Sequence, residues 1–210
     1  IWSGREQDRE KASKKGMCAL WCDTEFRGTD GHGGGKYTKD ELISTIISSC
    51  GPMQAGINNR GLAAGAVMFT GGEPTLQLDY DLLVGLMEAN IDCLIETNGT
   101  RCVDFAYEAA NAATLFGKGQ LWVTVSPKPP AEVNTFFKTN RFDEIKLIYD
   151  KKNVDPKDYI SLPAKYRFLQ PLDSHHDETN ERNISETLEY VLANPLWRMG
   201  LQSHKVWKVL

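Results

Sequence analysis

The sequence lacks any apolar stretch long enough to cross a membrane, and it lacks a basic run. A spanning helix needs about 20 consecutive apolar residues, so we expect no membrane partner. The formal net charge is −4, which argues against nucleic acid as the main partner, because phosphate backbones attract basic surfaces. A secretory signal, an internal repeat and a compositional break are also missing.

Cysteines are few and odd in number, five in all. Without regular spacing they form no disulfide framework, and we expect a reducing cytoplasmic setting. Cys18 and Cys22 are consistent with an iron–sulfur cluster, with zinc or with core packing. Zinc needs two further ligands, and the four histidines offer no close partner. We expect Cys50, Cys93 and Cys102 to pack in the core, because their neighbours are apolar.

The 210 residues, 41% of them hydrophobic, are enough for one α/β domain with its own core. Thr38 and Glu41 have the spacing of a capping box at the start of a helix. We predict helices over 39–50, 79–91, 102–116 and 184–195, and strands over 64–69, 92–99, 120–128, 143–150, 166–173 and 197–206. This alternation predicts a largely parallel sheet.

Polar motifs stand at the ends of four predicted strands: TGGEP (70–74), ETNG (96–99), SPK (126–128) and QPLD (170–173). Ligands of parallel sheets bind beyond the carboxyl ends of the strands. Each motif alone is compatible with ordinary turn chemistry. Four of them at one edge indicate a single active site.

The TGGEP motif suits a ligand that carries an amino-acid group. Gly71 and Gly72 let the backbone approach a ligand closely, so their amides can bind a carboxylate. Glu73 can accept hydrogen bonds from an ammonium group. The arrangement also resembles a phosphate loop, but it lacks the lysine and the serine or threonine of that motif.

Several motifs occur together in a characteristic order: IWSGRE, CDTEF, TGGEP, IETNG, VSPK, LQP and MGLQSHK. Over essentially the whole chain they resemble the 7-carboxy-7-deazaguanine synthase family of radical S-adenosylmethionine enzymes. The resemblance implies an incomplete (βα)-type radical barrel of the α/β class with a largely parallel sheet. It also implies a single core domain over residues 1–210.

The resemblance further implies the activity. Such an enzyme contracts the ring of 6-carboxy-5,6,7,8-tetrahydropterin to 7-carboxy-7-deazaguanine, with release of ammonia, in queuosine and other 7-deazapurine biosynthesis. A [4Fe–4S] cluster held by three cysteines cleaves S-adenosylmethionine, and the resulting 5′-deoxyadenosyl radical removes a hydrogen from C6 of the substrate. Mg²⁺ orients the substrate carboxylate. A homodimer, a cytoplasmic location and an electron donor such as flavodoxin are also expected.

The resemblance assigns roles to individual residues. Cys18 and Cys22 match cluster ligands, and Thr24 matches the Mg²⁺ ligand. The residues that match contacts of S-adenosylmethionine are Trp21, Asp23, Gly72, Glu73, Ser126, Pro127, Lys128 and Gln170. Those that match substrate contacts are Thr70, His204 and Leu210.

The sequence departs from the family pattern in three places. The family has a first cluster cysteine and a strand before the IWSG stretch, so we expect a chain starting at Ile1 to be N-terminally incomplete. Three residues separate Cys18 from Cys22, one more than is usual in the family. The ending HKVWKVL also differs from that of the family.

Three other functions are considered beside this one. The first is a different radical S-adenosylmethionine enzyme, of the activating type that makes a glycyl radical. The second is a cluster-free homologue that acts as a binding module. A zinc-binding protein is the third. The VSPK and QSHK segments argue against the activating enzyme.

Overall fold

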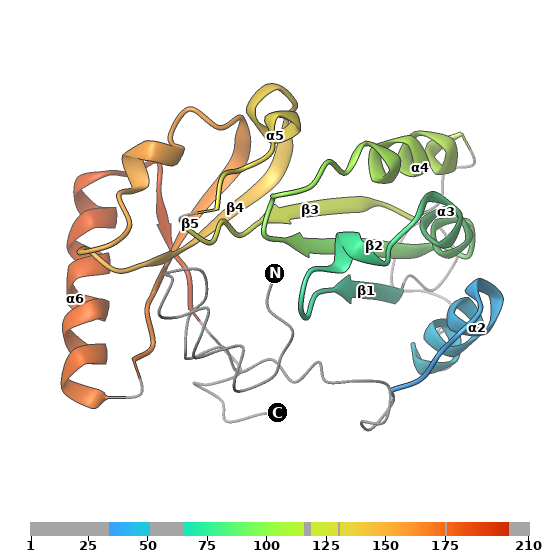
Figure 1. The fold of residues 1–210 in the computed structure, drawn as a ribbon, viewed down its shortest axis with the longest axis horizontal. Coiled ribbons are helices and arrows are strands. Elements are labelled where there is room, and N and C mark those ends of the chain that lie inside the picture. Colours follow the sequence, from blue (N-terminus) through green and yellow to red (C-terminus); the bar gives the residue numbers. More distant parts are fainter. Residues whose placement is uncertain (1–33, 51–64, 116–118, 130, 175, 202–210) are drawn as a thin grey trace, which may run out of the picture.

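The computed structural model describes residues 34–50, 65–115, 119–129, 131–174 and 176–201 (Figure 1). Their centre is a six-stranded parallel sheet in the order β1-β2-β3-β4-β5-β6. The strands are β1 (Gly65–Phe69), β2 (Ile91–Thr97), β3 (Leu121–Val125), β4 (Phe142–Tyr149), β5 (Ala164–Pro171) and β6 (Arg198–Met199). Within the described residues the sheet is not closed, which fits a partial barrel. The predicted α/β class is confirmed.

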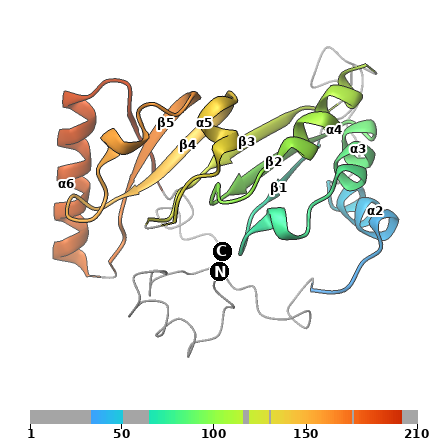
Figure 2. The same cartoon turned by 45° about the horizontal axis from the view of Figure 1, so that its top comes forward.

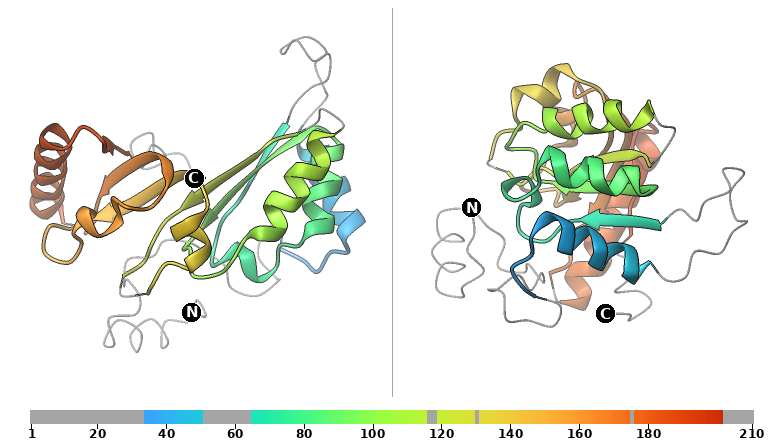
Figure 3. Two further views of the ribbon diagram at one scale, coloured as in Figure 1. Left: turned by 90° about the horizontal axis from the view of Figure 1, so that it is seen from above. Right: turned by 90° about the vertical axis from the view of Figure 1, so that its right-hand side faces the viewer.

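Helices connect the strands, as parallel pairing requires. They are α2 (Lys39–Ser49), α3 (Tyr80–Glu88), α4 (Asp104–Thr114), α5 (Thr135–Thr139) and α6 (Asp177–Ala193), with short 3₁₀ helices η1 (Pro74–Leu76) and η2 (Pro156–Tyr159). In Figure 2, α3 and α4 lie side by side near β2 and β3. Figure 3 shows α6 at the opposite end of the sheet, where it contacts β5. Among the described helices, none has the length and apolarity to cross a membrane.

The helix starts follow their local sequences. Thr38 accepts a hydrogen bond from the Glu41 amide, and the Glu41 carboxylate accepts one from the Thr38 amide, so the predicted capping box is confirmed. At α3, the Asp79 side chain accepts from the Leu82 amide at 2.9 Å. Each cap satisfies a backbone donor that the helix itself leaves without a partner.

The sheet has two chemically different faces, because successive side chains of a strand point to opposite sides. The covered face packs against helices and is apolar. Its fully buried members include Cys93, Ile95, Val123, Val125, Ile145 and Leu147. The alternate residues form the open face, and they include Leu94, Glu96, Trp122, Glu144, Lys146 and Tyr166, all only partly buried. Polar chemistry is therefore concentrated on the open face.

Three sequence predictions need correction. α6 begins at Asp177 instead of Ile184, so the polar segment before Ile184 is helical. β6 pairs over only Arg198–Met199, and residues 202–206 of the predicted strand lie outside the described part. Cys93 is buried as expected, but Cys50 and Cys102 are exposed. Their apolar neighbours are a poor guide to which way each side chain points.

Leu86 on α3 provides a test of the core. Its side chain is 0% exposed, whereas that of Leu192 on α6 is 75% exposed. We expect Leu86→Ala to lower the free energy of unfolding by about 2–5 kcal/mol, because it leaves a cavity among apolar groups. Leu192→Ala, the matched control, should change it by about 0.5 kcal/mol or less. Urea unfolding measures both, and equal losses would contradict this core.

Candidate functional site at the carboxyl edge of the sheet

The polar motifs gather at the carboxyl edge of the sheet. TGGEP follows β1, and Asn98 follows β2. Ser126 follows β3, and Gln170 occupies the carboxyl end of β5. Because all described strands run parallel, these segments share one edge, as the sequence predicted. This is the edge where parallel sheets bind ligands.

Glu73 ties the β1 turn to the end of β2. Its side chain is buried, with 8% of its surface exposed. Oε1 accepts hydrogen bonds from the Thr75 amide at 3.2 Å and from the hydroxyls of Thr75 and Thr97, both at 2.6 Å. Oε2 accepts from the Asn98 amide at 2.8 Å. A carboxylate oxygen can accept more than one bond, so Oε2 retains capacity for a further donor.

Two glycines with positive φ shape this edge. Gly71 has φ +102°, and no described atom beyond its chain neighbours lies within 4 Å of the position its Cβ would take. Within the described part of the chain, the turn therefore presents open backbone on that side. Gly99 has φ +77°, and a Cβ there would lie 2.6 Å from Cγ1 of Val125. Residues that carry a side chain rarely adopt a positive φ, so both turns depend on glycine.

The SPK segment continues the edge at β3. The Ser126 amide donates to the Thr97 carbonyl at 2.7 Å, which extends the contact between β2 and β3. Lys128 Nζ lies 2.7 Å from the Ser126 hydroxyl oxygen. Ser126 is buried and Lys128 is exposed. An ammonium group has three donors and can contact more than one acceptor at once.

The structure brings one part of the predicted site together. Described at the carboxyl edge are Thr70, Gly72, Glu73, Ser126, Pro127, Lys128 and Gln170. Outside the described residues lie Cys18, Trp21, Cys22, Asp23, Thr24, His204 and Leu210. Within the described ranges no group of three or more His, Cys, Asp or Glu residues is placed to hold a metal ion. The predicted cluster and Mg²⁺ ligands therefore stay predictions.

The open face carries a row of polar residues of which the motif search found only Glu96, in ETNG. Glu96, Thr124, Glu144 and Tyr166 pair in register across β2 to β5. Lys146 Nζ lies 2.6 Å from Oε1 of Glu96. The sequence signal was present, because Glu144 and Lys146 alternate with apolar residues in DEIKLIYD. Alternation of this kind places them together on one face.

Aromatic rings extend the same face toward β6. The rings of Trp122 and Tyr166 stack, with centroids 5.7 Å apart and planes 10° apart. The Arg198 guanidinium lies 5.1 Å from the Tyr166 ring centroid. Trp122 Nε1 donates to the Thr124 hydroxyl at 3.2 Å. The open face thus offers charged, aromatic and hydrogen-bonding groups side by side.

Glu144 is the carboxyl group on this face whose pKa is raised. Burial is the main cause, and the negative charges of Glu96 and Asp143 act in the same direction. The Lys146 ammonium opposes them. The raised pKa of Glu144 therefore reflects chiefly the burial of this carboxyl group, with the two neighbouring carboxylates adding to it.

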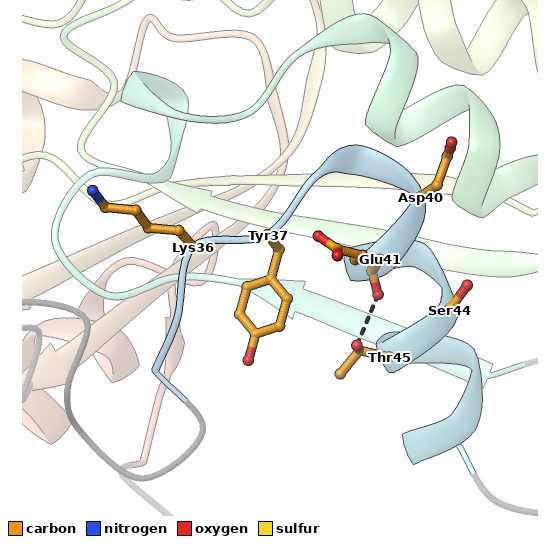
Figure 4. Close-up of a pocket in the computed structure, with 6 residues that line it drawn as sticks. All are labelled: Lys36, Tyr37, Asp40, Glu41, Ser44 and Thr45. Carbon is orange, nitrogen blue, oxygen red and sulfur yellow. Dashed lines mark hydrogen bonds between the residues drawn. The ribbon is translucent and has the colours of Figure 1, made fainter.

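A separate hollow of about 590 Å³ lies beside the start of α2 (Figure 4). Lys36 and Tyr37 precede the helix, and the other lining residues, Asp40, Glu41, Ser44 and Thr45, belong to its first turns. The Thr45 hydroxyl donates to the Glu41 carbonyl at 2.7 Å. Of the predicted site residues that the structure describes, none lines this hollow, which is wide open to solvent. We therefore place the candidate site at the carboxyl edge.

Comparisons with known proteins give one consistent result, although no family model matches the chain. The chain is 36% identical to the 7-carboxy-7-deazaguanine synthase of Nitratidesulfovibrio vulgaris, over 98% of this chain and 83% of that protein. The proteins of the same name from Bordetella pertussis and Burkholderia multivorans are each 34% identical, over 98% of this chain and 82% of theirs.

Replacement of Glu73 tests its structural role. Glu73→Gln keeps the shape but points an amide donor at groups that are themselves donors. We expect the free energy of unfolding to fall by about 1–3 kcal/mol, the usual result of leaving buried polar groups without partners. Glu88→Gln, at an exposed position on α3, is the matched control. Urea unfolding that gives the same small change for both would refute the role.

Glu144→Gln tests the raised pKa. The folded chain binds the Glu144 proton more tightly than the unfolded chain, whose carboxyl has the ordinary value of 4.5. Glu144 therefore stabilises the wild-type protein below pH 4.5, and this contribution is lost as pH rises through the pKa that Glu144 has in the folded chain. Glutamine does not titrate, so it loses nothing over this pH range. The free energy of unfolding of the variant should therefore increase relative to that of the wild-type protein as pH rises.

Denaturant unfolding between about pH 4 and pH 8 measures this difference. Glu88→Gln again controls for the loss of one negative charge at an exposed site. If the wild-type protein instead became more stable relative to Glu144→Gln as pH rises, the raised pKa would be contradicted.

Proposed function

Because this chain belongs to the 7-carboxy-7-deazaguanine synthase family, we propose that it converts 6-carboxy-5,6,7,8-tetrahydropterin to 7-carboxy-7-deazaguanine. The reaction contracts the ring and releases ammonia. Loss of ammonia accounts for the whole difference in composition between substrate and product, so no net oxidant is consumed. The observation that carries the proposal is the similarity of at least 34% identity over 98% of the chain to three such synthases.

The chemistry calls for a [4Fe–4S] cluster and S-adenosylmethionine. When bound, they supply the hydrogen-atom abstraction that starts the ring contraction. The described edge fits the amino-acid end of S-adenosylmethionine. It offers the open turn at Gly71, the buried carboxylate of Glu73 for an ammonium group and the exposed ammonium of Lys128 for an anionic group.

The individual roles follow the family pattern. We assign Cys18 and Cys22 to the cluster and Thr24 to Mg²⁺, for which a hydroxyl oxygen is a suitable hard ligand. The residues assigned to S-adenosylmethionine are Trp21, Asp23, Gly72, Glu73, Ser126, Pro127, Lys128 and Gln170. Those assigned to the tetrahydropterin are Thr70, His204 and Leu210.

The protein side of this chemistry is binding and shielding. Hydrogen bonds within the chain hold Glu73 and Ser126 in place before any ligand arrives. A site organised in advance loses less conformational entropy on binding. Gln170 is buried at the end of β5, where its amide can contact a ligand that fills the edge. A packed edge of this kind also keeps water from a reactive intermediate.

We also propose a homodimer that works in the cytoplasm, as part of queuosine or another 7-deazapurine pathway. The reducing cytoplasm suits a cluster that needs free thiolates. A small electron-transfer protein such as flavodoxin is proposed as the donor. These assignments rest on the family and not on a contact in the chain.

Anaerobic turnover tests the function. The full gene product, reconstituted with iron and sulfide, should convert the tetrahydropterin to 7-carboxy-7-deazaguanine and ammonia in the presence of S-adenosylmethionine and Mg²⁺. Chromatography with mass detection measures the product. Cys22→Ala should lose both the visible absorbance of the cluster and the product, because a cluster ligand is gone.

Cys102→Ala, at an exposed cysteine that is not among the predicted ligands, is the matched control and should keep both signals. A cluster that cleaves S-adenosylmethionine without consuming the tetrahydropterin would indicate a different radical enzyme. The absence of any cluster in the wild-type protein would indicate a binding module.

A further inference from the structure

Lys146 and Glu96 meet across the open face of the sheet from strands that are not neighbours. Lys146 belongs to β4 and Glu96 to β2, and Nζ lies 2.6 Å from Oε1. The side chains are 26% and 24% exposed. Between the two strands lies β3, whose Thr124 pairs in register with Glu96 on one side and Glu144 on the other. The ion pair therefore bridges the middle strand.

A second carboxylate, Glu144, lies on the same strand as Lys146, two residues away on the same face. Glu144 lies two strands from Glu96 in the same row, about 9.6 Å away at the backbone given the usual strand spacing. Its pKa is raised by burial and by Glu96, and lowered by Lys146. Among the described residues, the group thus places two carboxylates, Glu96 and Glu144, near one ammonium. A ligand with several donors would complete it.

Stability alone gives little reason for this arrangement. A partly buried ion pair loses hydration and side-chain freedom, so its net contribution is small. On the covered face of the same strands, Ile95 and Ile145 fill the equivalent positions with apolar groups. A charged pair on the open face is better explained by what it binds.

The backbone beneath Glu96 is tied to the candidate site. Glu96 directly precedes Thr97, whose hydroxyl donates to Glu73 at 2.6 Å. The Asn98 amide donates to the same carboxylate. These bonds fix the end of β2, but they leave the long Glu96 side chain to be oriented by its contact with Lys146.

The substrate of the proposed reaction has the matching chemistry. Its pterin ring carries N–H donors on the 2-amino group and on ring nitrogens, next to an acceptor at the 4-oxo group. We propose that Lys146 is a positioning residue, which holds the Glu96 carboxylate so that it accepts hydrogen bonds from these ring N–H donors. This inference rests on the proposed function and adds a recognition role to the open face.

Steady-state kinetics of Lys146→Met provides the test. We expect KM for the tetrahydropterin to rise about ten-fold with kcat nearly unchanged, which is the pattern for lost ground-state binding. Affinity for S-adenosylmethionine should stay at the wild-type value. Lys146→Arg, which keeps the charge, should restore KM to within about three-fold. Adding Glu96→Gln to Lys146→Met should raise KM little further, because both changes disrupt one interaction.

Lys151→Met is the matched control, because it removes the ammonium of another ion pair, 3.8 Å from Glu186. It should leave KM unchanged. An unchanged KM in Lys146→Met would overturn the inference, and so would a KM that arginine does not restore. If Lys146→Met also bound S-adenosylmethionine more weakly and unfolded at a lower urea concentration, the change would be general damage to the fold, and the inference would be overturned.

The inference and the proposed function fail in different ways. A wild-type protein that makes no product refutes the function. Calorimetric titration with the tetrahydropterin then decides the inference separately, because it needs no turnover. Weaker binding to Lys146→Met than to wild type supports the role of Lys146, and equal binding overturns it.

Discussion

The buried carboxylate of Glu73 is the interaction on which the candidate site depends. It accepts hydrogen bonds from the amide and the hydroxyl of Thr75, in its own turn. It also accepts them from the Thr97 hydroxyl and the Asn98 amide at the end of β2. A buried carboxylate is tolerated only when such donors satisfy it. The two bonds from Thr97 and Asn98 tie the turn after β1 to the end of β2. The geometry of two strand ends thus follows from one side chain.

The second constraint is the contrast between the two faces of the sheet. Parallel sheets usually carry apolar side chains on both faces, because helices or barrel closure cover both. Here Val123 and Val125 are buried on the covered face, while Trp122 is only partly buried on the open face. Among the described residues, the open face instead carries charged and aromatic groups. That composition suits the polar substrate and the charged cofactor of the proposed function.

Much of the fold was predictable because its signals are local. The Thr38–Glu41 capping box marks the start of α2. Short apolar runs ending in glycine or proline mark β1 to β3, and the parallel order follows from the intervening helices. The polar strand ends were predictable for the same reason, since each is a short contiguous motif.

The failures arose where local pattern and tertiary packing disagree. At α6, the apolar residues Ile184, Leu188 and Leu192 are exposed. The face that packs on the sheet instead buries Asn183 and Thr187. Asn183 succeeds there because its side-chain amide donates to the Leu172 carbonyl at 2.8 Å. Periodicity of apolar residues therefore placed the start of this helix at Ile184 and missed the polar turns before it, which begin at Asp177.

The sequence could not predict the Lys146–Glu96 pair for a related reason, since 49 residues lie between its members. Their meeting depends on register, because a slip of one residue would send either side chain to the covered face. Ile95 and Ile145, next to them in sequence, prevent that slip, since it would expose both to water and bury two charges. The apolar core therefore sets the position of the charged groups. The open face keeps its chemistry only while the covered face keeps its packing.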